Sequence, residues 1–191
     1  MFPIEAFRQT LDKAVQIFTA LGIRFHLTGG ITTVFYGEPR LSQVFDIVVD
    51  NSAISTRLDE FFALLAQSDL MFDELAIRTA VESRRMFQLL DTVESLKLDV
   101  YPRELIPGEL ERSVIAEVFA GTSLPIASWA DAAASKLVWI SKGSHKSRRD
   151  LRQILRLSPA LDRQLFEGLA VDLGLQDLAG TVLAELDEPL E

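Results

Sequence analysis

Residues 23–49 read IRFHLTGGITTVFYGEPRLSQVFDIVV, and the order of turns and apolar runs in them limits the fold more than any other part of the chain. The run Ile23 to Thr28 is followed by Gly29-Gly30, and a helical pattern then extends to Tyr36. The apolar run Val44 to Val49 is interrupted only by Asp46. Because such short runs predict strands and the glycines predict turns, the stretch predicts a strand, a Gly-Gly turn, a short helix, a loop and a buried central strand.

The flanking sequence predicts further helices and strands on both sides of this stretch. Apolar residues at three- and four-residue spacing predict a helix from Ile4 to Phe18, a helix from Ser52 to Leu65 capped by Ser52, and a weaker helix over 73–81. Met86 to Leu90 and Leu96 to Tyr101 predict two strands joined by a polar turn. Residues 113–126 give a mixed, partly extended pattern.

The last third of the chain predicts helices without strands. Ser128 and Asp131 are spaced like a capping box and predict a helix to about Lys142, and residues 146–186 predict three short helices. We therefore expect an α+β (α/β) fold, a small mixed twisted sheet flanked by helices with a C-terminal helical bundle. The expected division is a sheet domain over 1–127 and a helical region over 128–191.

Composition indicates an ordinary globular protein. The 191 residues are 48% hydrophobic and 25% charged, and the chain is long enough for one domain with a helical appendage. No apolar run approaches the roughly 20 residues that cross a bilayer, and the first 20 residues carry charges that a signal peptide's apolar region would not. We therefore expect a cytoplasmic protein that does not contact membranes.

Charge and cysteine content exclude several classes of site. The chain has no cysteine, which excludes disulfides, thiolate catalysis and Cys-ligated zinc. The net charge of −9 argues against a broad surface for duplex DNA, because such binding depends on Lys and Arg neutralising phosphates. A small phosphate ligand held by a few local cations is compatible with this charge.

Two of the predicted strands carry a carboxylate. Side chains two positions apart on a strand face the same side, so positions 44 and 46 point together into whatever cleft lies over the sheet. Phe45 then points into the opposite core. The strand Leu96 to Tyr101 carries Asp99, which can join Asp46 from a neighbouring strand.

This combination resembles the polymerase-beta-like nucleotidyltransferase superfamily. The resemblance is closer to the minimal nucleotidyltransferase family related to the AbiEii toxins of bacterial abortive-infection and toxin-antitoxin systems, and it covers roughly residues 20 to 155. The matching motifs are Gly29-Gly30, Tyr36-Gly37-Glu38-Pro39-Arg40 with Ser42, Phe45-Asp46-Ile47-Val48-Val49, Leu98-Asp99-Val100, Ala134-Ser135-Lys136-Leu137 and the basic segment ending in Arg149-Asp150-Leu151.

The resemblance implies a role for each matching residue. Asp46 and Asp99 are the implied catalytic and metal-binding residues, and Mg²⁺ is the implied cofactor. The implied phosphate- and nucleotide-binding residues are Gly29, Gly30, Arg40, Ser42 and Lys136. Glycines without a side chain would let backbone N–H groups approach phosphate oxygens, and the hydroxyl and cations would bind the same phosphates.

The sequence departs from the family at position 44. The family's motif reads Asp-x-Asp at positions 44 and 46, and this chain has Val44. Valine supplies no metal ligand, so we expect a weakened Mg²⁺ site in which water and phosphate supplement the remaining carboxylates. Glu38 in the preceding loop is a candidate substitute. Three interpretations stay open: a pseudoenzyme, a weakened enzyme with an altered ligand set, and a variant carrying an inactivating change.

Simpler structural explanations exist for each residue taken alone. The Gly-Gly pair can be an ordinary turn, Asp46 a solvent-facing carboxylate, and Asp99 an edge residue paired with Lys97. Lys136 can be an exposed helix lysine, and the basic residues 142–149 a solvated helix end. His26 is expected to be packed or hydrogen-bonded rather than a ligand. The joint order of the residues favours the functional interpretation.

Two functions from different classes follow. The first is transfer of a nucleoside monophosphate from Mg-NTP to an acceptor hydroxyl on RNA, a protein or a small molecule, impaired by Val44 and placed by the resemblance in a toxin-antitoxin pair. The alternative is a catalytically inactive module that acts through nucleotide or protein binding. The C-terminal helices supply more apolar surface than a short tail needs, which indicates a homodimer or an antitoxin-like partner; the residues concerned are Leu165, Leu169, Val171, Leu173 and Leu178.

Overall fold

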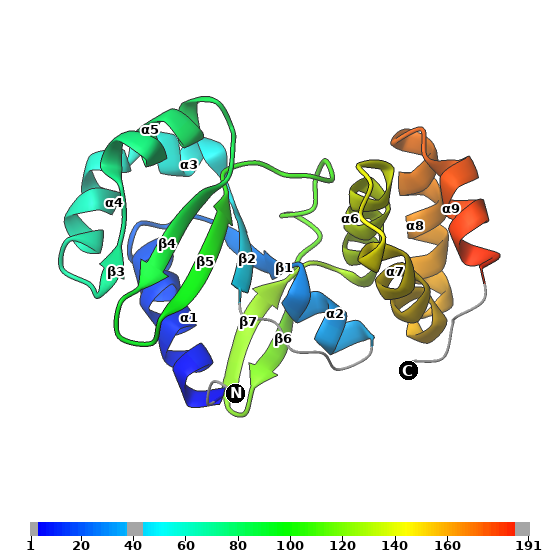
Figure 1. Ribbon diagram of the computed structural model, residues 1–191, viewed down its shortest axis with the longest axis horizontal. Coiled ribbons are helices and arrows are strands. Elements are labelled where there is room, and N and C mark those ends of the chain that lie inside the picture. Colours follow the sequence, from blue (N-terminus) through cyan, green and yellow to red (C-terminus); the bar gives the residue numbers. More distant parts are fainter. Residues whose placement is uncertain (1–3, 38–43, 186–191) are drawn as a thin grey trace.

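The computed structural model describes residues 4–37 and 44–185, and within them a single mixed sheet forms the centre of the molecule (Figure 1). Its strands are β1 (Phe25–Thr28), β2 (Val44–Val49), β3 (Leu70–Met71), β4 (Phe87–Asp91), β5 (Leu96–Tyr101), β6 (Val114–Phe119) and β7 (Thr122–Ile126). Their order across the sheet is β3-β4-β5-β2-β1-β7-β6. Strand β2 pairs antiparallel with β1 and parallel with β5, so the sheet is mixed as predicted.

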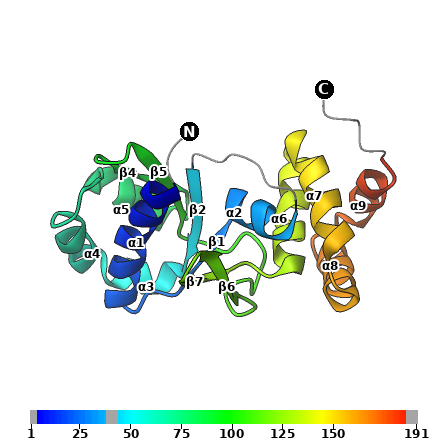
Figure 2. The ribbon, with the colours of Figure 1, turned by 90° about the horizontal axis from the view of Figure 1, so that it is seen from below.

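Helices lie at both ends of this sheet (Figures 1 and 2). They are α1 (Ile4–Ala20), α2 (Gly30–Tyr36), α3 (Asn51–Thr56), α4 (Leu58–Leu65), α5 (Glu74–Glu82), α6 (Trp129–Ser141), α7 (Lys146–Leu157), α8 (Ala160–Asp172) and α9 (Gln176–Leu183). Helices α1 and α3 to α5 gather at one end, and α6 to α9 form a bundle at the other, next to α2. The predicted fold class is confirmed. The division into a domain over 1–127 and a helical region over 128–191 stays a prediction.

The described residues 23–37 and 44–49 adopt the predicted strand, turn, helix and strand, and alternation along β2 sets the two faces of the sheet. Phe45 and Ile47 are buried, and the Phe45 ring packs edge-on against Phe7 of α1 with centroids 5.4 Å apart. The apolar face of β2 is therefore covered by α1. Asp46, between these two residues, must point to the other face.

The segment after β2 differs from the sequence prediction in two respects. The predicted single helix is broken at Arg57, whose φ of −126° and ψ of 22° end α3 and begin α4. Its cap is Asp50 rather than Ser52, because the Asp50 carboxylate accepts hydrogen bonds from the backbone N–H groups of Ser52 and Ala53 at 2.9 and 3.1 Å. A carboxylate at the end of a strand is already in the extended conformation that an N-cap requires.

Other elements follow the prediction more closely. The helix over 73–81 is α5, capped by Asp73, and Ser128 caps α6 by accepting from the Asp131 N–H. The partly extended stretch 113–126 is the antiparallel pair β6 and β7. The two-residue strand β3 was not predicted, because two residues are too few to show an alternation of apolar and polar side chains. None of the helices in the described part of the chain is long and apolar enough to cross a membrane.

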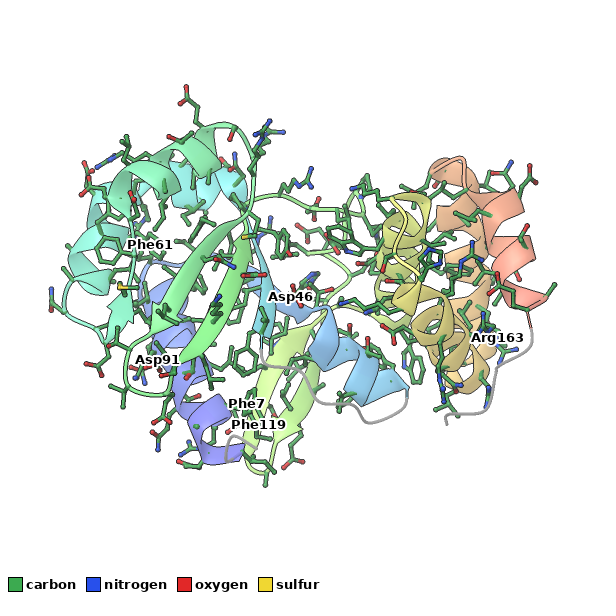
Figure 3. The ribbon with its side chains drawn as sticks, viewed as in Figure 1. Phe7, Asp46, Phe61, Asp91, Phe119 and Arg163 are labelled. Carbon is green, nitrogen blue, oxygen red and sulfur yellow. The ribbon has the colours of Figure 1, made fainter. Side chains whose placement is uncertain are left out.

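A buried carboxylate fixes α1 against the sheet. Asp91, at the end of β4, is fully buried and accepts hydrogen bonds from Thr10 Oγ1 and Lys13 Nζ of α1, both at 2.8 Å (Figure 3). It also accepts from the N–H groups of Val93 and Glu94 in its own turn. Burial alone raises the pKa of Asp91, but the hydrogen bonds from Lys13, Thr10 and the turn outweigh it, so this pKa lies below its ordinary value.

We predict that Asp91→Ala lowers the free energy of unfolding by about 3 kcal/mol, because it leaves the Lys13 ammonium and the turn N–H groups without their buried acceptor. Urea unfolding at pH 7 measures the loss. A carboxyl with a lowered pKa stabilises the fold above its ordinary pKa and ceases to do so as the pH falls, so the loss should shrink below about pH 4.

Asp69→Ala is the matched control, since Asp69 also pairs with Lys13, at 3.4 Å, but is exposed. An exposed ion pair contributes less than about 1 kcal/mol. Equal losses from the two variants would contradict the special role of Asp91.

Candidate active site

Strand pairing places the two predicted carboxylates side by side. Asp46 of β2 and Asp99 of β5 are direct partners in the parallel register, so both side chains leave the same face of the sheet. Both residues are half-buried, and Figure 3 shows Asp46 near the middle of the molecule, between the strands and the C-terminal helices. The alternative that Asp99 is an edge residue is wrong, because β5 lies between β4 and β2. Its Oδ1 accepts from Gln88 Nε2 of β4 at 2.7 Å.

The Gly-Gly turn lies directly against Asp46. Gly29 has a φ of +64°, and a Cβ added there would lie 2.0 Å from Asp46 Oδ2. The Gly30 N–H, at the start of α2, points to the same oxygen at 3.5 Å. Only glycine meets both the backbone conformation and the space at position 29, so the turn is more than a connection between elements.

Electrostatics at Asp46 oppose its negative charge. Burial and the neighbouring Asp99 carboxylate raise the pKa of Asp46 above its ordinary value. The Gly30 N–H, the Tyr101 hydroxyl, which donates to Asp46 Oδ1 at 3.2 Å, and the Lys136 charge act in the opposite direction without cancelling the shift. Burial and the two carboxylates also raise the pKa of Tyr101, which keeps this hydroxyl a donor. A bound cation would relieve the repulsion between the carboxylates.

Lys136, predicted to bind a phosphate, forms an ion pair with a carboxylate of the protein. It lies on α6, is buried, and donates to Asp150 Oδ2 of α7 at 2.9 Å. The interpretation of Lys136 as an exposed helix lysine is therefore wrong. Its charge acts on Asp46, since it lowers the pKa of that carboxyl, but a phosphate would have to share it with Asp150. Arg40, Ser42 and Glu38 lie outside the described residues.

A narrow cavity of about 40 Å³ borders Asp46. The side chains and backbone that line it belong to Thr28, Gly29, Asp46, Val48, Tyr101, Arg103, Leu105, Glu109, Ser135 and Trp139. Thr28 pairs with Asp46 in the β1–β2 register, and its buried hydroxyl has no hydrogen-bond partner within residues 4–37 and 44–185. An unsatisfied buried hydroxyl next to the Asp46 carboxylate is suited to a ligand or a water molecule.

The loop that forms one wall of this cavity is held by Glu109. Its buried carboxylate accepts from the N–H groups of Leu105 and Ile106 at 2.6 and 3.3 Å, and its second oxygen lies 3.5 Å from His26 Nε2. His26 is buried, and its Nδ1 lies 2.8 Å from Ser113 Oγ, so the prediction of a packed, hydrogen-bonded histidine is confirmed.

Sequence reasoning missed several residues of the cleft. Thr28 directly precedes Gly29, and Tyr101 follows Asp99 by two positions, so strand alternation could have placed both on the Asp46 face. Arg103 and Glu109 lie on a loop, where no period predicts the direction of a side chain. These two positions are visible only in the folded chain.

The donor groups are compatible with one magnesium ion. Within the described part of the chain no cluster of three or more His, Cys, Asp or Glu residues could hold a metal. Asp46 and Asp99 supply two carboxylates on one face, and Mg²⁺ commonly binds through one or two carboxylates, with water and phosphate oxygens completing its coordination. Val44 pairs with Lys97 in the β2–β5 register.

Comparison with solved structures agrees with this architecture. The antibiotic-resistance factor ANT(2'')-Ia superposes with a TM-score of 0.59 and 12% identity over 95% of this chain and 97% of its own. An antigenic nucleotidyltransferase-like protein from Paracoccidioides brasiliensis gives 0.50 and 15% over 93% of both chains. The chain has a nucleotidyltransferase fold.

Other comparisons add little to this assignment. The lincomycin-bound lincosamide antibiotic adenylyltransferase LnuA gives a TM-score of 0.49 and 12% identity over 78% of this chain and 97% of its own. No family model and no curated protein matches the sequence. At these identities the likeness establishes the nucleotidyltransferase fold alone, so the function depends on the residues of the site.

We predict that Gly29→Ala destabilises the nucleotidyltransferase fold by more than 1–2 kcal/mol, roughly the cost of a left-handed helical conformation for an alanine, because a φ of +64° with a ψ of −119° is less favourable still for an alanine and the new Cβ also displaces the Asp46 carboxylate. Thermal and urea unfolding measure the loss. Gly22→Ala is the matched control, since Gly22 has a φ of +62° and nothing within 4 Å of an added Cβ. If Gly29→Ala lost no more stability than Gly22→Ala, the Asp46 carboxylate would have moved away from the new Cβ at no cost in free energy, which would contradict the prediction.

We predict that Asp46→Asn raises the melting temperature at pH 7–8 in EDTA, since it removes a charge that burial and Asp99 disfavour. A raised pKa means that the folded state binds the proton more tightly, so stability falls as the pH rises above the ordinary value of 3.8. The gain should therefore shrink toward pH 4. Asp172→Asn, at an exposed site, controls for the removal of one charge, and an equal gain there would refute the argument.

Proposed function

We propose that this chain binds a nucleoside triphosphate with Mg²⁺ and transfers the nucleoside monophosphate to an acceptor hydroxyl. The observation that carries the proposal is the direct pairing of Asp46 with Asp99 beneath a glycine turn whose missing Cβ leaves room for the Asp46 carboxylate. Such contact between a strand carboxylate and a turn at a helix start brings a metal ligand and backbone N–H donors to one point. That arrangement is suited to a metal-bound phosphate.

Each site residue has a part in this proposal. Asp46 and Asp99 hold the ion, while Gly29 and Gly30 let the triphosphate approach the start of α2. Lys136, with Arg40 and Ser42 from the segment before β2 in the sequence, contributes charge and hydrogen bonds to the phosphates. Mg²⁺, when bound, neutralises the phosphates and the leaving group.

The transfer itself is a substitution at phosphorus. The acceptor oxygen attacks the α-phosphorus, the bond from that phosphorus to the oxygen bridging to the β-phosphate breaks, and pyrophosphate leaves. The proton of the acceptor hydroxyl passes to solvent. The chain's residues contribute orientation and charge, which supply most of the catalysis in phosphoryl-type transfers.

Val44 favours an impaired form of this activity. It gives no ligand, and Lys97 is its partner on β5, so the position meant for a third carboxylate is apolar and faces a lysine. The second candidate function is a catalytically inactive module that acts through nucleotide or protein binding. The buried Lys136–Asp150 ion pair favours this candidate too, because it occupies a lysine that the phosphates would otherwise use.

A toxin-antitoxin role is a further proposal that rests on the resemblance to AbiEii-like proteins. The C-terminal helices give it limited support. Leu165 and Val171 are exposed, while Leu169 is buried in the bundle and Leu173 and Leu178 are partly buried. A homodimer or an antitoxin-like partner would bind these helices, and light scattering that shows a monomer at all concentrations would count against the homodimer.

We predict that Val44→Asp tightens binding of Mg²⁺-nucleotide by about tenfold, or roughly 1.4 kcal/mol, because it restores a second carboxylate on the same strand face. Calorimetric titration with ATP, GTP, CTP and UTP in Mg²⁺ compares the variant with the unchanged protein. Val44→Asn is the control for size and polarity without charge. Lys97→Ala, added to both proteins, removes the lysine that would neutralise a new carboxylate.

The outcomes separate the two candidate functions. Tighter binding in Val44→Asp together with Mg²⁺-dependent release of pyrophosphate, lost in Asp99→Asn, supports the transferase. Nucleotide binding without release of pyrophosphate in any variant supports the inactive module. No binding in any variant, including those with Lys97→Ala, would refute a nucleotide site at Asp46 and Asp99.

A further inference from the structure

A second, larger depression adjoins the cavity at Asp46. It encloses about 580 Å³ at the ends of β2 and β5, a volume in the range of small-molecule sites, which is roughly 300–1,000 Å³. Its lining belongs to Arg24, Val49, Asp50, Asn51, Ser52, Arg84, Arg103, Glu104, Pro107, Gly108, Leu110 and Glu111. Arg103 lines both this depression and the cavity next to Asp46, so the two are neighbours.

The acidic residues of the depression are already engaged. Asp50 accepts from two N–H groups of α3 and from Arg24 at 3.0 Å. Glu111 pairs with Arg24 as well, and the two oxygens of Glu104 accept from backbone N–H groups of the loop that follows β5. The negative charges of the lining are thus already hydrogen-bonded or ion-paired within the protein.

Two arginines of the lining differ from Arg24 in this respect. Arg84 and Arg103 are exposed, and the guanidinium group of neither makes a hydrogen bond or an ion pair within residues 4–37 and 44–185. Arg103 lies close enough to Tyr101 to lower the pKa of that hydroxyl against the larger effects that raise it. In a chain of net charge −9, two guanidinium groups without a carboxylate partner on the wall of one depression form a local site for an anion.

The backbone at Arg84 is unfavourable for an arginine. Its φ is +52°, and it directly follows the end of α5, where the Arg84 and Arg85 N–H groups bond to the carbonyls of Val81 and Ala80. This left-handed position after a helix is normally glycine or asparagine. An arginine there costs conformational free energy that glycine would not, and stability therefore does not explain the residue.

We propose that the depression binds the acceptor of the transfer through an anionic group, a phosphate or a carboxylate, held by Arg84 and Arg103. The guanidinium groups bind that anion in fork geometry, and the acceptor's hydroxyl extends past Arg103 toward Asp46 and Asp99. The assignment of the ligand as acceptor rests on the proposed function. The binding of the anion does not, since it depends only on the lining of the depression.

The test uses ribose 5-phosphate, which carries one phosphate and several hydroxyls, in the absence of Mg²⁺. Dissociation constants come from NMR titration of the arginine Nε–H signals of the full chain. Arg84→Gly and Arg103→Ala should each weaken binding at least tenfold. Arg84→Gly should keep or raise the melting temperature, because glycine suits the left-handed conformation, so loss of binding cannot be attributed to unfolding.

Two controls separate charge and strain from binding. Arg85→Ala removes the neighbouring exposed arginine, which does not line the depression, and should leave the dissociation constant unchanged. Ser95→Gly relieves another left-handed residue, with a φ of +57°, in the turn between β4 and β5, and should also leave binding unchanged. The proposal would be overturned if ribose, which has no phosphate, bound as tightly as ribose 5-phosphate. It would also be overturned if Arg84→Gly and Arg103→Ala bound ribose 5-phosphate as tightly as the unchanged protein.

Asp99→Asn distinguishes this inference from the proposed function. It should abolish Mg²⁺-nucleotide binding and leave the affinity for ribose 5-phosphate unchanged. Loss of both would show that the sugar phosphate binds in the nucleotide cleft, which contradicts the proposal. Binding of ribose 5-phosphate that depends on Arg84, in a protein that binds no nucleotide in any variant, would refute the transferase and leave the anion site standing.

Discussion

The contact between Gly29 and the Asp46 carboxylate is the constraint on which the rest of the site depends. A Cβ at position 29 would lie 2.0 Å from Asp46 Oδ2, so this position of the turn must be glycine. The Asp46 carboxylate then lies against the start of α2, where the Gly30 N–H points to it. Antiparallel pairing of β1 with β2 brings the turn to Asp46, and parallel pairing of β2 with β5 brings Asp99 to the same place. Three segments distant in sequence therefore meet at one point.

Two strand carboxylates of this chain have environments that shift their pKa values in opposite directions. Asp91 is surrounded by donors, including the Lys13 ammonium, and its pKa is lowered. Asp46 is half-buried beside another carboxylate, and its pKa is raised. The first arrangement stabilises the packing of α1 on the sheet. The second leaves an electrostatic cost in the folded chain that a bound cation would remove, and costs of this kind concentrate at functional sites.

The C-terminal helices contribute both charge and cavity lining to the site. The Lys136 charge acts on Asp46 from α6 and is shared with Asp150 of α7, while Trp139 and Ser135 of α6 line the cavity. The charge near Asp46 is therefore coupled to the packing of two helices. The loop held by Glu109 and the arginines beyond it extend the same face of the sheet into a larger depression.

The sequence by itself determined β1, the Gly-Gly turn, α2 and β2, the buried face of β2 and the placement of Asp46 and Asp99 on strands, because these features depend on local periods and on glycine chemistry. Tertiary structure alone decided that Asp50 caps α3, that Lys136 is paired with Asp150, and that Arg84 and Arg103 share a depression. Those contacts join side chains that are close only after the sheet has assembled, and loops such as 102–113 have no period from which their directions follow. A pattern along the chain specifies which face a residue occupies, whereas its partner is set by the packing of distant segments.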